Sequence, residues 1–71
     1  MKITVINNRK EEAVVEIPDD GVLLDVKKAA EKVWGIPVNK QNIARGEVAE
    51  NDADILNKYY IREGSFVRIH H

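Results

Sequence analysis

Residues 27–37 read KKAAEKVWGIP, the second half of an amphipathic helix with its stop signal attached. Gly35 can adopt the left-handed conformation that ends a helix, and Pro37 lacks the N–H that a continuing helix would need. The apolar residues of this helix fall three or four apart and so share one face: Leu23, Val26, Ala30 and Val33. The sequence therefore predicts one helix with a single apolar side, which must pack against the rest of the chain.

The predicted helix is preceded by the chain-breaking segment Pro18-Asp19-Asp20-Gly21. An aspartate just before a helix accepts hydrogen bonds from free backbone N–H groups and opposes the positive end of the dipole. We therefore expect Asp19 or Asp20 to cap a helix that begins near Gly21 or Val22.

Polar and apolar residues alternate near both ends of the chain, which is the pattern of half-buried strands. Residues 1–7 and 13–17 flank turn-forming asparagines and predict a β-hairpin, and residues 65–70 predict the last strand. A turn at Gly64, which is free to take a positive φ, precedes that last strand. Side chains alternate along a strand, so the odd-numbered residues should face the core: Ile3, Val5, Ala13, Val15, Ile17, Val67 and Ile69.

The segment between Pro37 and the last strand holds only short elements. We expect a tight turn at 38–41, a short strand at 42–45 that reverses at Gly46 into 47–49, and a helical turn at 55–59 anchored by Leu56 and Tyr59.

This order of elements predicts an α+β fold, with a mixed sheet of four to five strands and one helix packed across it. The first and last strands should lie side by side and parallel, because the helix supplies the crossover connection that parallel strands require. The arrangement is a β-grasp roll with a short helical turn before the last strand. The length of 71 residues allows a single domain, 1–71.

Composition excludes several classes of protein. The chain has no cysteine, so neither a disulfide framework nor a thiolate metal site supports its core. Its net charge of −1, with both signs interspersed, argues against a nucleic-acid partner. No apolar run approaches the roughly 20 residues of a membrane span, and the start MKIT is not a signal peptide. We expect an intracellular protein, cytoplasmic or nuclear, with no membrane partner.

The helix stop belongs to a longer series of residues, in the order Val26-Lys27, Gly35-Ile36-Pro37, Gln41, Asp52, Leu56, Tyr59, Ile61 and Ser65. Through this series the chain resembles ubiquitin and ubiquitin-like domains over essentially its whole length. The resemblance implies an ion pair between Lys27 and Asp52. It also implies a Gln41 side chain bonded to backbone at the helix end, and a Tyr59 hydroxyl bonded to the backbone of the acidic loop.

The chain departs from this family at functional positions. The positions that match the hydrophobic recognition patch of ubiquitin are Asn8, Ala44 and His70, each polar or truncated. The chain ends at His70-His71, without the Gly-Gly tail that modifiers and sulfur carriers of the family activate. The resemblance therefore implies the fold, while the usual recognition surface is missing.

Three apolar residues of the predicted strands are even-numbered and should point away from the core: Ile6, Val14 and Phe66. The first strand of a β-grasp sheet lies between the second and the last, so these residues should meet. We define the sheet-face patch as Thr4, Ile6, Val14, Phe66, Arg68 and His70. A contiguous exposed apolar group often marks contact with another molecule, although β-propensity and cross-strand packing alone would also explain it.

Leu24 and Trp34 form a secondary candidate, because neither lies cleanly on the inner face of the predicted helix. An exposed tryptophan is a favoured anchor in interfaces. The structural alternative is that Trp34 folds over the helix end against Pro37 or Val38.

Residues suited to catalysis or metal binding are few. The nucleophile candidates are Thr4, Ser65 and two tyrosines, and His70 and His71 lie at the C-terminus, where nothing is expected to hold them. Adjacent histidines on a strand point to opposite faces and chelate poorly. The acidic run 47–54 lacks the ligand spacing and the turn glycine of a calcium loop. We therefore expect no enzymatic activity, metal or cofactor.

Together these features predict a monomeric, non-catalytic ubiquitin-like module that binds a protein partner through the exposed face of its sheet. Three alternatives stay open: a modifier or carrier whose Gly-Gly tail has been removed, a small structural subunit of a larger complex, and an engineered ubiquitin-like protein.

Overall fold

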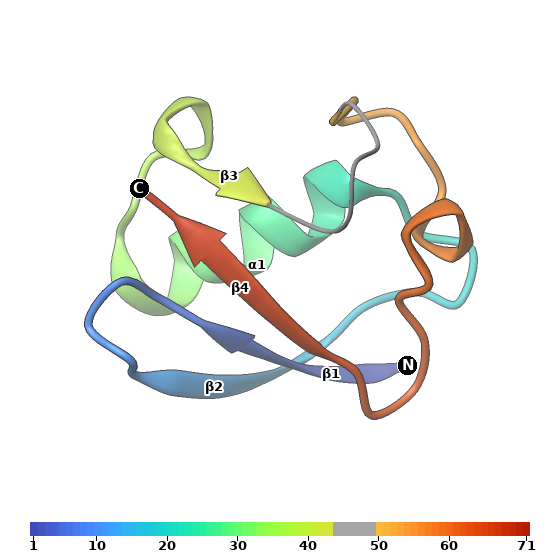
Figure 1. The fold of residues 1–71 in the computed structure, drawn as a ribbon, viewed down its shortest axis with the longest axis horizontal. Coiled ribbons are helices and arrows are strands. Elements are labelled where there is room, and N and C mark those ends of the chain that lie inside the picture. Colours follow the sequence, from blue (N-terminus) through green and yellow to red (C-terminus); the bar gives the residue numbers. More distant parts are fainter. Residues whose placement is uncertain (44–49) are drawn as a thin grey trace.

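The centre of the sheet is a pair of parallel strands, β1 (Lys2–Ile6) and β4 (Phe66–His70). The structure is a computed structural model that describes residues 1–43 and 50–71. Strand β2 (Glu12–Glu16) pairs antiparallel with β1, and β3 (Asn42–Ile43) pairs antiparallel with β4, giving the order β2-β1-β4-β3 (Figure 1). Helix α1 (Leu23–Trp34) packs across one face of this sheet. The structure thus confirms the predicted α+β, β-grasp-like fold with parallel central strands.

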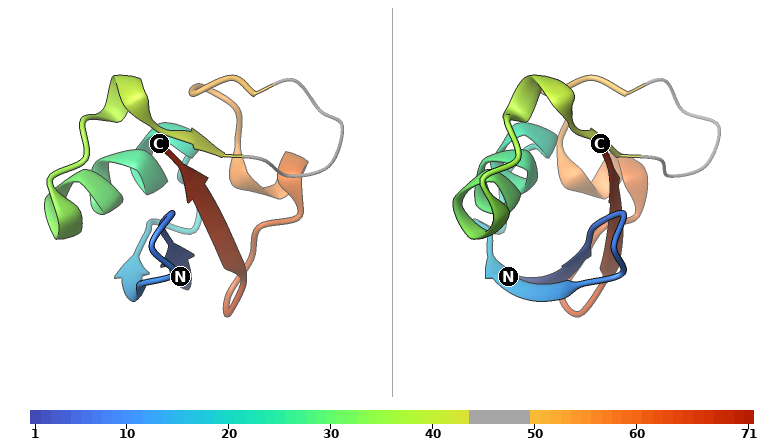
Figure 2. Two further views of the ribbon diagram at one scale, coloured as in Figure 1. Left: turned by 60° about the vertical axis from the view of Figure 1, so that its left-hand side comes forward. Right: turned by 90° about the vertical axis from the view of Figure 1, so that its left-hand side faces the viewer.

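The sheet bends around α1, so that its inner face encloses the core and its outer face is convex (Figure 2). The core is made almost wholly of the expected residues, none more than 8% exposed: Ile3, Val5, Val15, Ile17, Leu23, Val26, Ala30, Ile36, Ile43, Leu56, Tyr59, Ile61, Val67 and Ile69. Ala13, also predicted to face inward, is only partly buried. The alternation of side chains along the strands is therefore confirmed.

The stop of α1 is confirmed at Gly35, which has φ 73° and donates its N–H to the carbonyl of Glu31 at 2.7 Å. A left-handed residue at this point is the common end of a helix, and glycine adopts it without a Cβ penalty.

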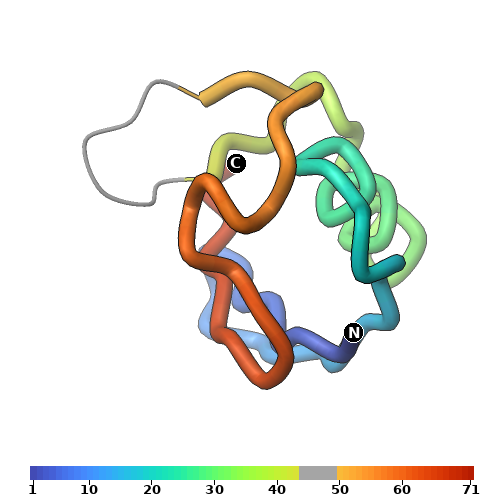
Figure 3. Tube along the Cα trace, turned by 90° about the vertical axis from the view of Figure 1, so that its right-hand side faces the viewer, coloured from blue at the N-terminus to red at the C-terminus, as the bar shows by residue number. Residues whose placement is uncertain are grey.

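The prediction that Asp19 or Asp20 caps α1 is wrong. The residue that precedes the helix is Val22, whose N–H donates to Oδ2 of Asp25 at 2.9 Å. The free N–H groups of the first turn donate to carbonyls of a distant loop: Leu23 to Asp54 and Leu24 to Asp52, both at 3.1 Å (Figure 3). A tertiary contact thus satisfies the donors that a capping side chain would otherwise take.

The predicted apolar face of α1 is wrong at its last turn. Val33 is 48% exposed, while Trp34 packs against the core and Lys27 is buried. From Ala30 the buried stripe continues four residues on rather than three, which keeps the larger tryptophan ring against the core. Trp34 therefore has a structural use in packing on the core, while its contact with Pro37 or Val38 stays a prediction.

The short elements also follow the expectation where the structure describes them. Single helical turns lie at η1 (Val38–Lys40) and η2 (Leu56–Tyr59), and Leu56 and Tyr59 are both buried. Gly64 takes φ 81° in the turn before β4. The remainder of the expected strand at 44–45, the reversal at Gly46 and the segment 47–49 lie outside the described residues.

Tyr60 follows η2 in the left-handed conformation, with φ 60°, although it is neither glycine nor asparagine. The conformation costs a bulky side chain roughly 1–2 kcal/mol, and Tyr60 is 81% exposed. We therefore expect Tyr60→Asn to raise the free energy of unfolding by about 0.5–1 kcal/mol, since asparagine tolerates this conformation. Urea unfolding followed by circular dichroism measures the change. Lys28→Asn, on an exposed helical position, should instead destabilise, and a loss of stability in Tyr60→Asn would contradict the strain.

Candidate functional site

The sheet-face patch is assembled by the register of the three strands β2, β1 and β4. Thr4 lies opposite Val14 on one side and opposite Phe66 on the other. Two residues further along β1, on the same face, Ile6 lies opposite Glu12 and Arg68. The structure therefore brings five of the six predicted patch residues into two adjacent rows, with Glu12 completing the second.

Exposure within the patch is greatest on the flanking strands. Val14 is 68% exposed and Phe66 is 60% exposed, while Thr4 and Ile6 on the middle strand are half-buried. The middle strand has a neighbouring strand on each side, and cross-strand neighbours cover part of its side chains. His70 lies opposite Asn42 at the far end of β4 and forms the edge of the patch, as expected.

Strand β2 is an edge of the sheet, and its backbone polar groups divide by parity. Backbone hydrogen bonds join Met1 to Ile17 and Asn7 to Glu11. The backbone N–H and C=O groups of the odd-numbered residues of β2 therefore point toward β1. The N–H and C=O groups of Glu12, Val14 and Glu16 consequently point away from the sheet. Charged side chains on such an edge oppose its pairing with another strand.

The turn between β1 and β2 is held by the side chain of the fully buried Asn7. Its Oδ1 accepts from the N–H groups of Arg9 at 2.9 Å and Glu11 at 3.1 Å. The predicted role of asparagine in this turn is confirmed, although the left-handed residue is Lys10, with φ 64°.

The expectation that nothing holds the C-terminal histidines is wrong for His71. The Asn8 side chain donates to the carbonyl of His71 at 2.6 Å, and the Asn8 N–H donates to Nε2 at 3.3 Å. This contact joins the first turn to the end of β4, between residues too far apart in sequence for a local pattern to indicate it.

The ion pair implied for Lys27 is present, and it has a second acid. Lys27 is 5% exposed, and its Nζ lies 2.6 Å from Oδ1 of Asp52 and also contacts Oε1 of Glu50. Burial lowers the pKa of Lys27, but hydrogen bonds to Asp52 and Glu50 outweigh it, so the pKa is raised. The other oxygen of Glu50 accepts from the N–H of Ile43 at 3.1 Å. Sequence reasoning missed Glu50 because nothing distinguishes it within the acidic run.

The bonding of the Gln41 side chain to backbone, implied by the resemblance, is also observed. Its Nε2 donates to the carbonyls of Lys27 and Ile36, both at 2.9 Å, and the residue is 2% exposed. These bonds hold the segment after the helix stop against α1.

The Tyr59 hydroxyl binds the acidic loop, as implied. It accepts from the N–H of Asn51 at 3.2 Å and donates to Oδ2 of Asp54 at 2.7 Å. The bond from Tyr59, together with Lys58 at 3.1 Å, lowers the pKa of Asp54, and the same bond raises the pKa of Tyr59. The acids at 50, 52 and 54 thus hold their own loop in place.

Leu24 and Trp34 do not form one surface. Both are half-buried, and ten residues of helix separate them by about 15 Å along the axis. Leu24 lies beside the acidic loop, where its N–H is bonded, while Trp34 packs on the core at the other end.

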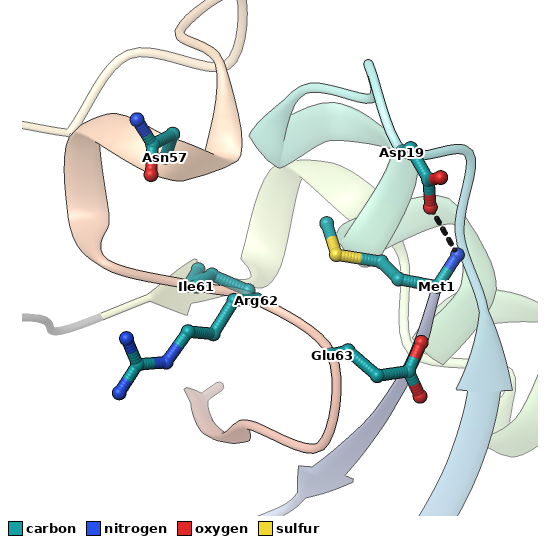
Figure 4. A pocket seen from close by; sticks show the side chains of 6 residues that line it. All are labelled: Met1, Asp19, Asn57, Ile61, Arg62 and Glu63. Carbon is teal, nitrogen blue, oxygen red and sulfur yellow. Dashed lines mark hydrogen bonds and ion pairs between the residues drawn. The ribbon is translucent and has the colours of Figure 1, made fainter.

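A shallow hollow of about 440 Å³ lies beside the N-terminus, lined by Met1, Asp19, Asn57, Ile61, Arg62 and Glu63 (Figure 4). The Met1 ammonium donates to Asp19 at 2.9 Å, and this bond raises the pKa of the ammonium group. Glu63 accepts from the N–H of Lys2 at 3.0 Å. Both acids of the hollow are therefore already bonded within the chain.

Ser65, one of the nucleophile candidates, is engaged within a turn. Its hydroxyl accepts from the N–H of Arg62 at 2.9 Å. Among residues 1–43 and 50–71, no three His, Cys, Asp or Glu side chains are placed to hold a metal ion. No helix in those same ranges is long and apolar enough to cross a membrane.

The fold and the patch together define a β-grasp-like domain with an exposed apolar row across the outer face of its sheet. No protein-family model matches the chain, and no curated protein matches it either.

Proposed function

We propose that this chain is a non-catalytic ubiquitin-like module that binds a protein partner through the sheet-face patch. The observation that carries the proposal is the row formed by Val14, Thr4 and Phe66. Two large apolar side chains, each more than half exposed, flank a small one on a rigid sheet. Contiguous apolar surface that contains an aromatic residue is typical of contact sites.

A binding role rather than a catalytic one is supported by how the polar side chains are used. The Tyr59 and Ser65 hydroxyls and the acids at 50, 52 and 54 are engaged in loop and turn hydrogen bonds. The ubiquitin-like assignment is supported by the three implied contacts of Lys27, Gln41 and Tyr59, which occur together with the β-grasp-like fold.

The test is site-specific photocrosslinking in cells with a benzophenone amino acid at position 66, and at position 28 as a control on the outer side of α1. The captured protein is then purified and its affinity for the chain is measured by calorimetry. Phe66→Ser should weaken binding about tenfold or more, since an aromatic anchor is lost, and Lys28→Ser should leave it unchanged. Equal losses in both variants, or equal capture at both positions, would contradict the proposal.

A further inference from the structure

The two rows that cross β1 within the patch, the second completed by Glu12 at the edge of the patch, carry complementary residues at matching places on either side of β1. In one row, the acidic Glu12 on β2 and the basic Arg68 on β4 flank Ile6. In the other row, Val14 on β2 and Phe66 on β4 flank Thr4. Neighbouring strands are about 4.8 Å apart, so each pair is placed nearly symmetrically about β1.

This symmetry has a consequence for two copies placed face to face. A two-fold axis that lies in the interface along β1 exchanges the β2 side of one copy with the β4 side of the other. Glu12 then faces Arg68 of the second copy, and Val14 faces Phe66 of the second copy. Ile6 and Thr4 lie near the axis and face their own counterparts.

We infer that the sheet-face patch binds a second copy of this chain around a two-fold axis that runs along β1. The inference rests on the proposed function, because it names the partner of the same surface. It revises the expectation of a monomer: the contact is isologous, so the pair of Glu12 with Arg68 forms twice, once on each side of the axis.

The same charges disfavour the other symmetric arrangements. A two-fold axis across the strands would place Glu12 opposite Glu16 of the second copy. Antiparallel pairing of two β2 edges centred on Val14 would oppose the same two acids. Like charges directly opposite one another destabilise strand contacts, so the charge pattern selects the axis along β1.

The contact should be weak, because the outer face is convex, so two such faces meet over a narrow area around β1 (Figure 2). Three strands of five residues cover only about 200–300 Å² in projection, well below the roughly 800 Å² per partner of a standard interface. Lys2 also lies near the axis, at the end of β1, where Glu16 of the same chain is its cross-strand neighbour. The dimer therefore forms at millimolar rather than micromolar protein concentration.

The test uses two single charge reversals, Glu12→Arg and Arg68→Glu. Either variant alone opposes like charges at both pairs and should weaken self-association about tenfold or more. An equimolar mixture of the two variants restores both opposite-charge pairs and should associate as the wild type does. The double variant E12R/R68E should also self-associate. Asp20→Arg and Lys28→Glu, both exposed and off the patch, are matched controls that should change nothing.

Association is measured by sedimentation equilibrium and by amide chemical shifts over a dilution series from millimolar to micromolar protein. Shifts should concentrate at Thr4, Ile6, Val14 and Phe66. Shifts independent of concentration would overturn the dimer, and a mixture no stronger than its components would overturn the two-fold axis. If self-association is absent but crosslinking at position 66 captures another protein, the inference fails and the proposed function stands; if both are absent, both fail.

Discussion

Lys27→Met is expected to lower the free energy of unfolding by about 2–3 kcal/mol, somewhat less than the ~3–5 kcal/mol for breaking a fully buried ion pair. The lysine is buried, and its loss leaves Glu50 and Asp52 without their cation. The Glu50 side chain is 20% exposed and that of Asp52 is 46% exposed, so water offsets part of the cost. Urea unfolding at neutral pH measures the change.

Two further variants test the cause of this loss. Lys28→Met, on the exposed side of α1, should change stability by less than about 0.5 kcal/mol. The triple variant K27M/E50Q/D52N should recover most of the loss, because it removes the unpaired charges as well as the lysine. A triple variant as unstable as Lys27→Met would contradict the unpaired charges as the cause of the loss.

The pH dependence has a defined sign. The pKa of Lys27 is raised in the folded chain, so the stability that its charge contributes is complete below its unfolded value, roughly 10.4. That contribution is lost as the pH rises through the folded pKa. The difference between wild type and Lys27→Met should therefore be constant at neutral pH and should shrink at strongly alkaline pH.

The parts of the fold that local rules decide could be predicted from the sequence. Gly35 and Pro37 end α1 whatever surrounds them, and parity along the strands separates core from surface side chains. The start of α1 could not be predicted in this way. Its first N–H groups donate to carbonyls of residues 52 and 54, about thirty positions away, and no property of Asp19 or Asp20 signals that competition.

The sheet-face patch was predictable for the same reason as the core, because parity that turns Val5 inward turns Thr4 and Ile6 outward. The pairing of Glu12 with Arg68 across Ile6 depends instead on strand register, which long-range packing sets. Glu50 is a similar case. It lies in an acidic run, and only the close approach of Lys27 and of the Ile43 N–H distinguishes it from its neighbours.

Leu56→Ala is expected to lower the free energy of unfolding by about 3 kcal/mol, within the ~2–5 kcal/mol range of leucine truncations in packed cores. Leu56 is 1% exposed and belongs to the core cluster beneath η2. A helical turn of four residues is too short to be stable alone, so its position depends on the side chains that it buries. A chain of this length has a total stability of only about 4–10 kcal/mol, so the variant should unfold at a clearly lower urea concentration.

The neighbouring Ile55→Ala is the matched control, because Ile55 has the same volume as Leu56 but is 57% exposed. It should cost less than about 1 kcal/mol. Hydrogen exchange locates the effect: the amides of Leu23 and Leu24, bonded to the carbonyls of Asp54 and Asp52, should exchange faster in Leu56→Ala than in Ile55→Ala. Unchanged exchange at these two amides would mean that the polar contacts of Lys27 and Tyr59 hold the acidic loop without help from the buried Leu56 side chain.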